Sequence, residues 1–412
     1  MKIIKRKFRT LILSSLLSAG VAGSATLGAE ELAQGITDNE ILVGHLGPQT
    51  GPVATYDKIR MGIESYFKYI NENGGVHDRQ LRLVAYDDQY QPGRTVQLTK
   101  RLVEEDQVFA MLANVCTPCN VATRARNERS GIPMIMTSSG SRQFVDPPIP
   151  NYMGSSVANY EFEARVLTDY AVNQLDAKRI AIAYQNDDYG SPLAEAAAEA
   201  LKQFDDVELV QEVNFQSSDS DLSTQAQRVR QSNPDAIITF SVPAPAAQFK
   251  KALHNVGVTE PHFLVSSVGG DSETLFNLAG EDVWNGTISS AVIPKPDQGS
   301  DESIDRYVER FSADFPDEPV SDWGQTGWAT AEVFVEALKR TDSLTWDSFL
   351  DTFYTFNNWQ GSMYAGVTFS EDNHYGLTSM FITEARDGKI IPTSEPITFD
   401  PASGEITYGA GN

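Results

Sequence analysis

Cysteine is nearly absent from this sequence, whose 412 residues include only Cys116 and Cys119. The five histidines are scattered along the chain, so no second pair of ligands completes a zinc site around this Cys-x-x-Cys motif. The motif leaves three alternatives open, namely a local disulfide, a pair of buried thiols or a thiol redox site. One tetrapeptide is weak support for redox catalysis, so we favour the disulfide or the buried thiols.

The motifs of several enzyme classes are also missing. The sequence contains no GxSxG nucleophile elbow, no HExxH zinc motif, no GxxxxGK phosphate loop and no EF-hand loop. We therefore expect a protein that is not an enzyme and that has no cofactor and no bound metal.

Basic residues are scarce, and the formal net charge is −24 at pH 7. A charge of this sign argues against binding to nucleic acid or to an anionic membrane surface. Residues 1–29 are the exception, because a basic start is followed there by a short apolar core and small residues. That order predicts a secretory signal peptide cleaved after Ala29, and the apolar core is too short to span a membrane. No later stretch is apolar and long enough to do so.

The rest of the chain alternates short apolar runs with amphipathic stretches, which predicts an α/β fold with parallel sheets. The alternation breaks near residues 146–151 and then starts again, so a βα sheet is laid down twice. The last residues predict a hairpin, with strands at 378–384 and 389–391 and a turn at Asp387 and Gly388.

Small polar residues follow two neighbouring predicted strands, 108–113 and 132–137. If these strands are parallel, both turns lie at the carboxyl edge of one sheet, where open α/β sheets bind ligands. Hydroxyl groups and the exposed backbone of a glycine suit a carboxylate or another small acceptor-rich group. The residues of this predicted patch are Thr117, Ser138, Ser139, Gly140 and Ser141.

Aromatic side chains lie beside other predicted turns at strand ends, where they could close over a small ligand. They are Tyr56, Tyr189, Trp323 and Trp328. The acids of the later turns, among them Asp187 and Asp271, could receive a cationic group.

Taken together, these residues resemble the periplasmic substrate-binding proteins of ABC importers, in the branch of the leucine/isoleucine/valine-binding proteins. The stretches that carry the resemblance are GPVATYDKIRMGIE, YINENGGV, VAYDDQYQP, GIPMIMTSSGS and AIAYQNDDYGSPLA. The resemblance implies two Rossmann-like, doubly wound α/β lobes joined by three crossings, the type I periplasmic-binding fold. It places lobe 1 at residues 38–157 and 290–375, and lobe 2 at residues 158–289 and 376–405.

The resemblance also implies roles for single residues. Thr117, Ser138 and Gly140 match positions that contact a ligand carboxylate, and Tyr56, Tyr189 and Trp328 match aromatics that line the cleft. The position of the family's acid for a ligand ammonium is occupied by Ser267, which is neutral. An organic acid without an α-amino group is therefore expected to bind better than leucine or valine.

The sequence thus predicts a monomeric receptor in the periplasm that binds a small carboxylate-bearing ligand and delivers it to an ABC permease. A receptor for branched-chain or other amino acids and a ligand-sensing subunit of a signalling system remain alternatives. A thiol-disulfide enzyme that uses Cys116 and Cys119 is a third.

Overall fold

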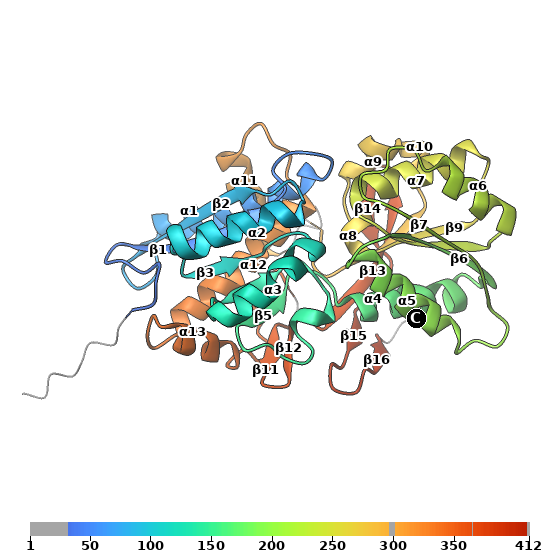
Figure 1. The fold of residues 1–412 in the computed structure, drawn as a ribbon. Helices are drawn as coiled ribbons and strands as arrows, with labels where there is room; N and C mark the ends of the chain where they lie inside the picture. The colour runs from blue at the N-terminus through green and yellow to red at the C-terminus, as the bar shows by residue number, and fades with distance from the viewer. Residues whose placement is uncertain (1–31, 296–300, 365, 410–412) are drawn as a thin grey trace, which may run out of the picture. The chain divides into compact units, whose positions relative to one another are not determined.

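The computed structural model describes residues 32–295, 301–364 and 366–409, which form two α/β lobes (Figure 1). The predicted signal peptide lies outside the described residues. In the described part of the chain, no helix combines the length and the apolar character that crossing a membrane requires.

The first lobe is built on a five-stranded sheet in the order β2-β1-β3-β4-β5. All of its strand pairs are parallel. Its strands are β1 (Glu40–Gly47), β2 (Gln80–Asp87), β3 (Ala110–Leu112), β4 (Met134–Thr137) and β5 (Tyr152–Ser155). A two-stranded antiparallel sheet of β11 (Thr368–Ser370) and β12 (Asn373–Gly376) packs beside β5.

The second lobe is built on a nine-stranded mixed sheet, in which β7, β6, β8, β9 and β10 run parallel and the later strands run antiparallel. The parallel strands are β6 (Arg179–Gln185), β7 (Glu208–Phe215), β8 (Ala236–Phe240), β9 (His262–Val265) and β10 (Thr287–Ala291). The later strands are β13 (Ser379–Arg386), β14 (Lys389–Pro392), β15 (Ile397–Phe399) and β16 (Ile406–Tyr408).

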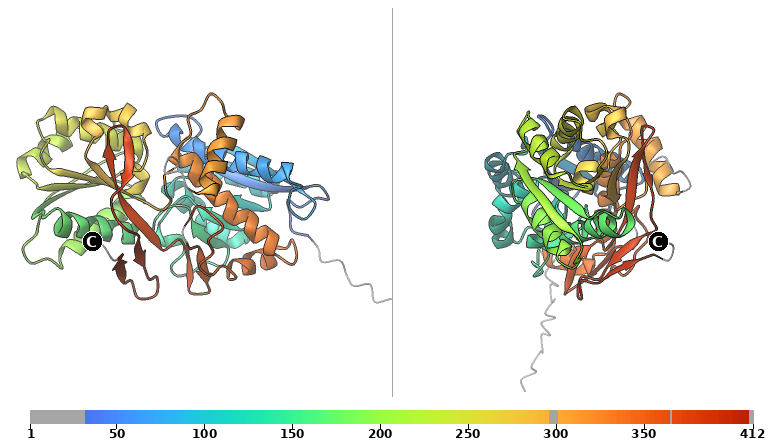
Figure 2. Two further views of the ribbon diagram at one scale, coloured as in Figure 1. Left: turned by 180° about the vertical axis from the view of Figure 1, so that it is seen from behind. Right: turned by 90° about the vertical axis from the view of Figure 1, so that its right-hand side faces the viewer.

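Helices cover the sheets on both faces (Figures 1 and 2). Those early in the chain are α1 (Asp57–Glu72), α2 (Pro92–Lys100), α3 (Thr117–Ser130), α4 (Tyr160–Asp169), α5 (Gly190–Leu201), α6 (Ser223–Ser232) and α7 (Pro243–Asn255). Those that follow are α8 (Ser267–Gly270), α9 (Thr274–Ala279), α10 (Glu281–Trp284), α11 (Glu302–Asp314), α12 (Asp322–Arg340) and α13 (Trp346–Phe353). Single π-helical turns extend α2 (Arg101–Glu105) and α4 (Tyr170–Gln174), and short 3-10 turns lie at Ala54–Tyr56 and Arg142–Phe144.

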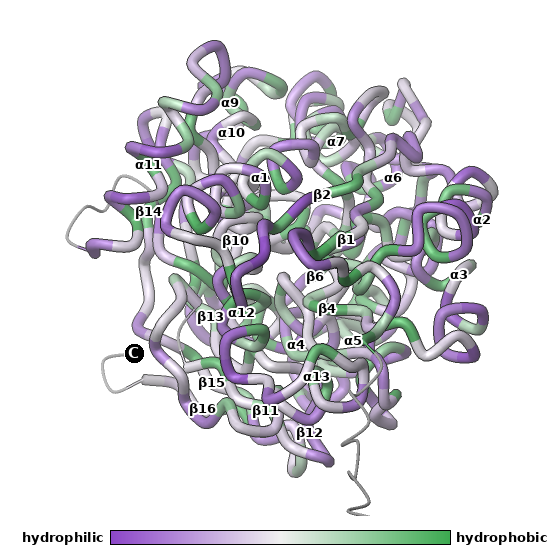
Figure 3. The backbone as a smooth tube through the Cα atoms, turned by 90° about the vertical axis from the view of Figure 1, so that its left-hand side faces the viewer, coloured by the Kyte–Doolittle hydropathy of each residue, from purple (hydrophilic) through white to green (hydrophobic). Residues whose placement is uncertain are grey.

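The inner strands are buried on both faces, which explains why they are continuous apolar runs in the sequence. Every residue of β3, β4 and β8 is buried. Figure 3 shows the same pattern along the backbone, because apolar residues lie mostly inside and the outer loops are mostly hydrophilic. The hydrophobic effect therefore holds each sheet between its helices.

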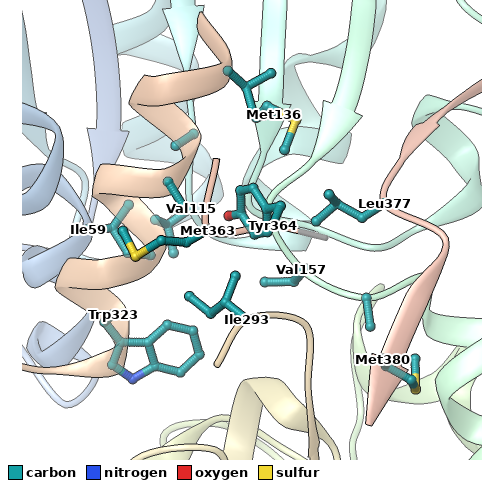
Figure 4. Close-up of a cluster of buried hydrophobic side chains, with 14 of the residues drawn as sticks. Ile59, Val115, Met136, Val157, Ile293, Trp323, Met363, Tyr364, Leu377 and Met380 are labelled. Atoms are coloured by element: carbon teal, nitrogen blue, oxygen red, sulfur yellow. The ribbon is translucent and has the colours of Figure 1, made fainter. Parts of the chain in front are cut away.

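Three described segments lie where the chain passes between the lobes: residues 156–159, 292–295 and 377–378. One buried apolar side chain from each, namely Val157, Ile293 and Leu377, belongs to a single hydrophobic cluster. Figure 4 shows Val157 and Ile293 near Trp323, and Leu377 on the far side of Tyr364. All three crossings thus contribute to one apolar cluster, which both lobes share.

The predicted fold class is confirmed, and so are the two successive βα sheets and the hairpin of β13 and β14. The short strands β11, β12, β15 and β16 were missed, because three or four residues are too few for a periodic pattern. The exact lobe boundaries stay a prediction.

Helices α1 and α12 approach each other closely enough for backbone contact. A Cβ atom at Gly327 would lie 2.0 Å from the carbonyl oxygen of Ile59, and one at Gly62 would lie 1.9 Å from that of Gly324. Only glycine fits at such a crossing of two helices. Helix α1 also carries Tyr56 at its start, so the crossing helps to place this side chain.

We expect Gly327→Ala to destabilise the fold by about 1–3 kcal/mol, because the added methyl group must push two helix backbones apart. Gly93→Ala is the matched control, since Gly93 lies in α2 with open space around its Cα. It should be neutral or stabilise by about 0.5–1 kcal/mol. Urea unfolding of both variants measures the difference, and equal free energies of unfolding would contradict the close contact.

Candidate functional site

A cavity lies between the lobes, at the carboxyl ends of the strands of both sheets. Its volume is about 20 Å³, which is room for about one water molecule. The residues that line it come from the turns after β1, β2, β3, β4, β6 and β9, from the first crossing, and from the starts of α1, α4 and α12: Tyr56, Ile59, Tyr90, Val115, Cys116, Thr117, Ser138, Val157, Tyr160, Tyr189, Val268 and Trp323.

The first-lobe wall of the cavity carries hydroxyl groups. Thr117, the first residue of α3, places its Oγ1 2.8 Å from the Oγ of Ser139 and 3.1 Å from the phenol oxygen of Tyr160. Ser138 lies in the turn after β4 and donates to the carbonyl of Ala113, 3.2 Å away. The turns after β3 and β4 are adjacent, as the sequence predicts, because the two strands pair in parallel.

The other members of the predicted hydroxyl patch support this wall from behind. Gly140 passes so close to the first crossing that a Cβ atom there would lie 1.7 Å from the carbonyl oxygen of Ala158. Its carbonyl accepts from the N–H of Tyr160 at 3.0 Å. Ser141 is buried and its N–H donates to Ser139. Gly140 thus places Tyr160, and Ser139 places Thr117.

A hydrogen bond connects the two lobes across the cavity, and a second one holds an aromatic ring within the second lobe. The phenol of Tyr56, on the first lobe, donates to the carbonyl of Val268 on the second lobe at 2.9 Å. Tyr189 lies at the start of α5, with its phenol oxygen 2.6 Å from the Oγ of Ser266. Its ring packs edge-on against Tyr160 at a centroid distance of 5.0 Å. Burial raises the pKa of Tyr56 and of Tyr189, so both phenols stay protonated and can donate.

One predicted aromatic lies elsewhere. Trp323 lines the cavity and packs edge-on against Tyr56 at 4.9 Å. Trp328 is instead fully buried against Tyr66 and Tyr307, on the face of α12 that meets α1 and α11. Five residues along a helix rotate a side chain by about 140° beyond a full turn, so Trp323 and Trp328 cannot both face the cavity. The placement of Trp328 at the cleft is corrected accordingly.

Two tyrosines of the lining, Tyr90 and Tyr160, were not predicted from the sequence. Tyr90 follows β2 and Tyr160 begins α4, immediately after the first crossing. The rule that strand ends face the cleft could have found Tyr90. Tyr160 fits the apolar pattern of α4, and nothing in that pattern distinguishes it from a core residue.

The two cysteines form a disulfide at the first-lobe wall. Cys116 and Cys119 are bonded to each other, and both are buried. Cys116 lines the cavity and also accepts a hydrogen bond from the N–H of Cys119. Because both sulfurs belong to the disulfide, neither is a thiolate in this structure. The bond fixes the turn that presents Thr117.

Ser267, predicted at the ammonium position, begins α8 beside the cavity, and its hydroxyl is buried. Its backbone N–H donates to Glu163, 2.6 Å away. Within the described ranges, no cluster of three or more His, Cys, Asp or Glu side chains is arranged to hold a metal ion.

A buried ion cluster joins the lobes next to Ser267. Lys295, on the second crossing, donates to the carboxylate of Asp271 on the second lobe. Its ammonium also lies 3.3 Å from the carboxylate of Asp322, at the start of α12 on the first lobe. All three side chains are buried. Burial raises the pKa of Asp271, and the charge of Lys295 opposes that rise.

A family model described as "Periplasmic binding protein" matches residues 40–389 of this chain. The chain belongs to the periplasmic binding protein family. The resemblance inferred from the sequence is thereby confirmed at the level of the family, which is one of binding proteins.

Two curated relatives of this binding protein are similar over part of their length. An amino acid binding protein of Pseudomonas aeruginosa is 23% identical over 61% of this chain and 65% of its own. The Leu/Ile/Val-binding protein of Escherichia coli K12 is 24% identical over 59% of this chain and 65% of its own. The match spans just under two thirds of the length of each relative.

Solved structures share the fold over most of the chain. A fatty acid ABC transporter substrate-binding protein from Thermomonospora curvata has a TM-score of 0.82 and 18% identity, and the match covers 91% of this chain and 96% of the other. A branched chain amino acid ABC transporter protein from Thermus thermophilus with bound valine has a TM-score of 0.79 and 20% identity, with coverages of 89% and 98%. The type I periplasmic-binding fold is therefore confirmed.

We expect Lys295→Met to destabilise the binding protein by about 3–5 kcal/mol, because Asp271 and Asp322 would stay buried without their cation. The loss should shrink as the pH falls from 8 to 5, since burial raises the pKa of Asp271 and the protonated carboxyl group needs no cation. Unfolding curves at both pH values measure it.

Lys178→Met is the control, because Lys178 pairs with Asp206 at an exposed site. This variant should unfold like the wild type at both pH values. A similar small change in the free energy of unfolding in both variants would contradict the stabilising role of Lys295 between the two buried acids.

Proposed function

We propose that this binding protein is a solute receptor of the periplasm, which binds a small carboxylate-bearing ligand between its lobes and delivers it to an ABC permease. The observation that carries the proposal is the cavity itself. Its wall combines the hydroxyls of Thr117 and Ser138 with aromatic rings from both lobes.

The first-lobe wall offers a binding site for a carboxylate. Thr117 carries a hydroxyl group that can donate, and it begins the 14-residue helix α3. The amino end of a helix carries a partial positive charge that stabilises a nearby anion. No side chain that lines the cavity is charged at neutral pH, so the carboxylate meets no competing anion there.

The remaining surface suits the apolar part of a small ligand. The rings of Tyr56, Tyr160, Tyr189 and Trp323 surround the cavity. The indole N–H of Trp323 is buried without a hydrogen-bond partner in the described part of the chain. Such rings offer large apolar faces at a low entropic cost, together with polar tips that can orient a ligand.

The size of the cavity implies that the lobes move during binding. A cavity of about 20 Å³ is much smaller than the ~300–1,000 Å³ of ordinary ligand sites. A ligand must therefore part the contacts between Tyr56 and Val268 and between Thr117 and Tyr160. Closure around the ligand is favourable only if the ligand touches both lobes. A ligand shifts the equilibrium between open and closed lobes only by binding one of these two states more tightly than the other.

The relatives support a carboxylate ligand without selecting one. The names of the curated relatives refer to amino acids, including leucine, isoleucine and valine. One solved structure holds valine, and another is named for fatty acids. All of these compounds carry a carboxylate.

A thermal-shift screen of amino acids, keto acids, hydroxy acids and short fatty acids tests the proposal. A ligand present at 100 times its dissociation constant should stabilise the folded state by about 2.7 kcal/mol. The matching amides and alcohols, which lack the carboxylate, should not stabilise it. Stabilisation by amides and acids alike would contradict a carboxylate site.

We expect Thr117→Ala to weaken binding of the best acid from this screen by about 10- to 150-fold, because it removes one hydrogen bond to a charged group. Thr123→Ala is the matched control: Thr123 is a buried threonine of the same helix whose hydroxyl bonds to the helix backbone, outside the cavity lining. Calorimetric titration of both variants separates the loss of a hydroxyl that lines the cavity from the loss of a hydroxyl elsewhere in the helix. An affinity that is unchanged in Thr117→Ala would remove this residue from the site.

A further inference from the structure

The C-terminal hairpin, formed by β15 and β16, lies where the two lobes meet. It follows the part of the chain that the family model matches, which ends at residue 389. In Figures 1 and 3 it lies next to the short sheet of β11 and β12, which packs on the first lobe. None of the residues of this hairpin, all of which the structure describes, lines the cavity. The hairpin is therefore separate from the candidate ligand site.

Strand pairing and hydrogen bonds attach this hairpin to the second lobe. Strand β15 pairs antiparallel with β13, and the N–H of Phe399 donates to the carbonyl of Thr378, on the third crossing, at 2.8 Å. The guanidinium of Arg165, on α4, donates to the carbonyl of Gly404 at 2.9 Å. The hairpin must therefore move with the second lobe when one lobe rotates relative to the other.

One side chain of the hairpin, that of Phe399, also reaches the first lobe. Its ring stacks on Phe162 of α4, with a centroid distance of 5.0 Å and an interplanar angle of 24°. It packs edge-on against Tyr375 of β12, at 6.0 Å and 88°. Tyr375 is buried in an apolar cluster of the first lobe that includes Phe144 and Tyr152. The ring of Phe399 is thus held between an element of each lobe.

The place of this contact makes it sensitive to the angle between the lobes. Tyr375 lies two residues before the third crossing, and Phe399 is bonded to that crossing. Aromatic pairs attract each other at centroid distances of about 4.5–7 Å, so a further separation of about 1 Å ends the contact between these two rings. A rotation in the opposite sense would press the rings together, and close-packed side chains resist that. The contact therefore favours one hinge angle.

The favoured angle is that of the closed lobes. In the arrangement that holds Phe399 against Tyr375, the cavity has room for about one water molecule, and Tyr56 reaches across it to Val268. A ligand can enter only when the lobes part, and this movement changes the hinge angle. The contact of Phe399 with the first lobe is therefore made in the closed form and weakened in the open form.

We propose that the C-terminal hairpin is a strap across the hinge, which holds the lobes together before any ligand is bound. Phe399 is the residue that connects this strap to the first lobe. The proposal goes beyond the solute-receptor function, because it concerns the balance between open and closed forms of the empty protein, whatever its ligand is. A ligand that favours the closed form then has a smaller population to shift, which increases its apparent affinity.

Small-angle X-ray scattering of the ligand-free protein tests the proposal, because the radius of gyration increases when two lobes part. Phe399→Ala removes the ring on the hairpin, and Tyr375→Leu removes the ring on the first lobe while the hairpin stays intact. We expect each variant to raise the ratio of open to closed molecules by about 2- to 10-fold, and thus to increase the radius of gyration. Tyr375→Leu keeps the proposal testable if Phe399→Ala fails to fold.

Tyr408→Ala is the matched control, because it removes an aromatic ring from the same hairpin. The phenol of Tyr408 donates to the carboxylate of Asp169 on α4, so this side chain connects the hairpin to the second lobe only through a bond that does not cross the hinge. Its loss should lower the midpoint of thermal unfolding slightly and leave the radius of gyration unchanged.

Three results would overturn the proposal. An unchanged radius of gyration in Phe399→Ala, with a lower midpoint of thermal unfolding, would show that the contact only stabilises the fold. A smaller radius would show that the hairpin keeps the lobes apart. An equal increase in Tyr408→Ala would show a general loosening of the hairpin. Because no sample contains a ligand, these results are independent of the carboxylate site, and failure of the proposed function would leave the strap unaffected.

Discussion

The three crossings are the constraint on which the rest of the structure depends. They keep the parallel strands of two sheets with their carboxyl edges facing each other, and each crossing contributes a side chain to one shared apolar cluster. Parallel strands end in turns on one edge, so the turns after β3, β4, β6 and β9 meet at the cavity. The cavity is a consequence of this arrangement, and no single loop creates it.

The same arrangement explains where the polar groups lie. The first lobe contributes hydroxyls at the amino end of α3, beside a disulfide that fixes the turn. The second lobe contributes carboxylates behind its wall, and Lys295 shares its charge between acids of the two lobes. A ligand that touches the hydroxyls of the first lobe and the rings of the second would meet the condition for closing two lobes over it.

The sequence was sufficient to predict the fold class and the hydroxyl turns, because both depend on local pattern and on the parallel pairing of neighbouring strands. The aromatic positions were harder to predict, since Trp323 and Trp328 lie on one helix and only the packing of α12 decides which of them faces the cavity. Glu163 could not be found from strand ends, because it lies within α4. Its contact with Ser267 spans 104 residues of sequence, and no local signal reports it.

The central claim is that the lobes close around a ligand at this cavity. Fluorophores attached to cysteines in Lys100→Cys on α2 and Lys202→Cys at the end of α5 would report the distance between the lobes, since both positions are exposed and the native cysteines are joined in a disulfide. Saturation with the acid that stabilises the protein most should change the energy transfer between the two labels. An unchanged transfer efficiency, with binding of the same acid verified by calorimetry, would contradict the account.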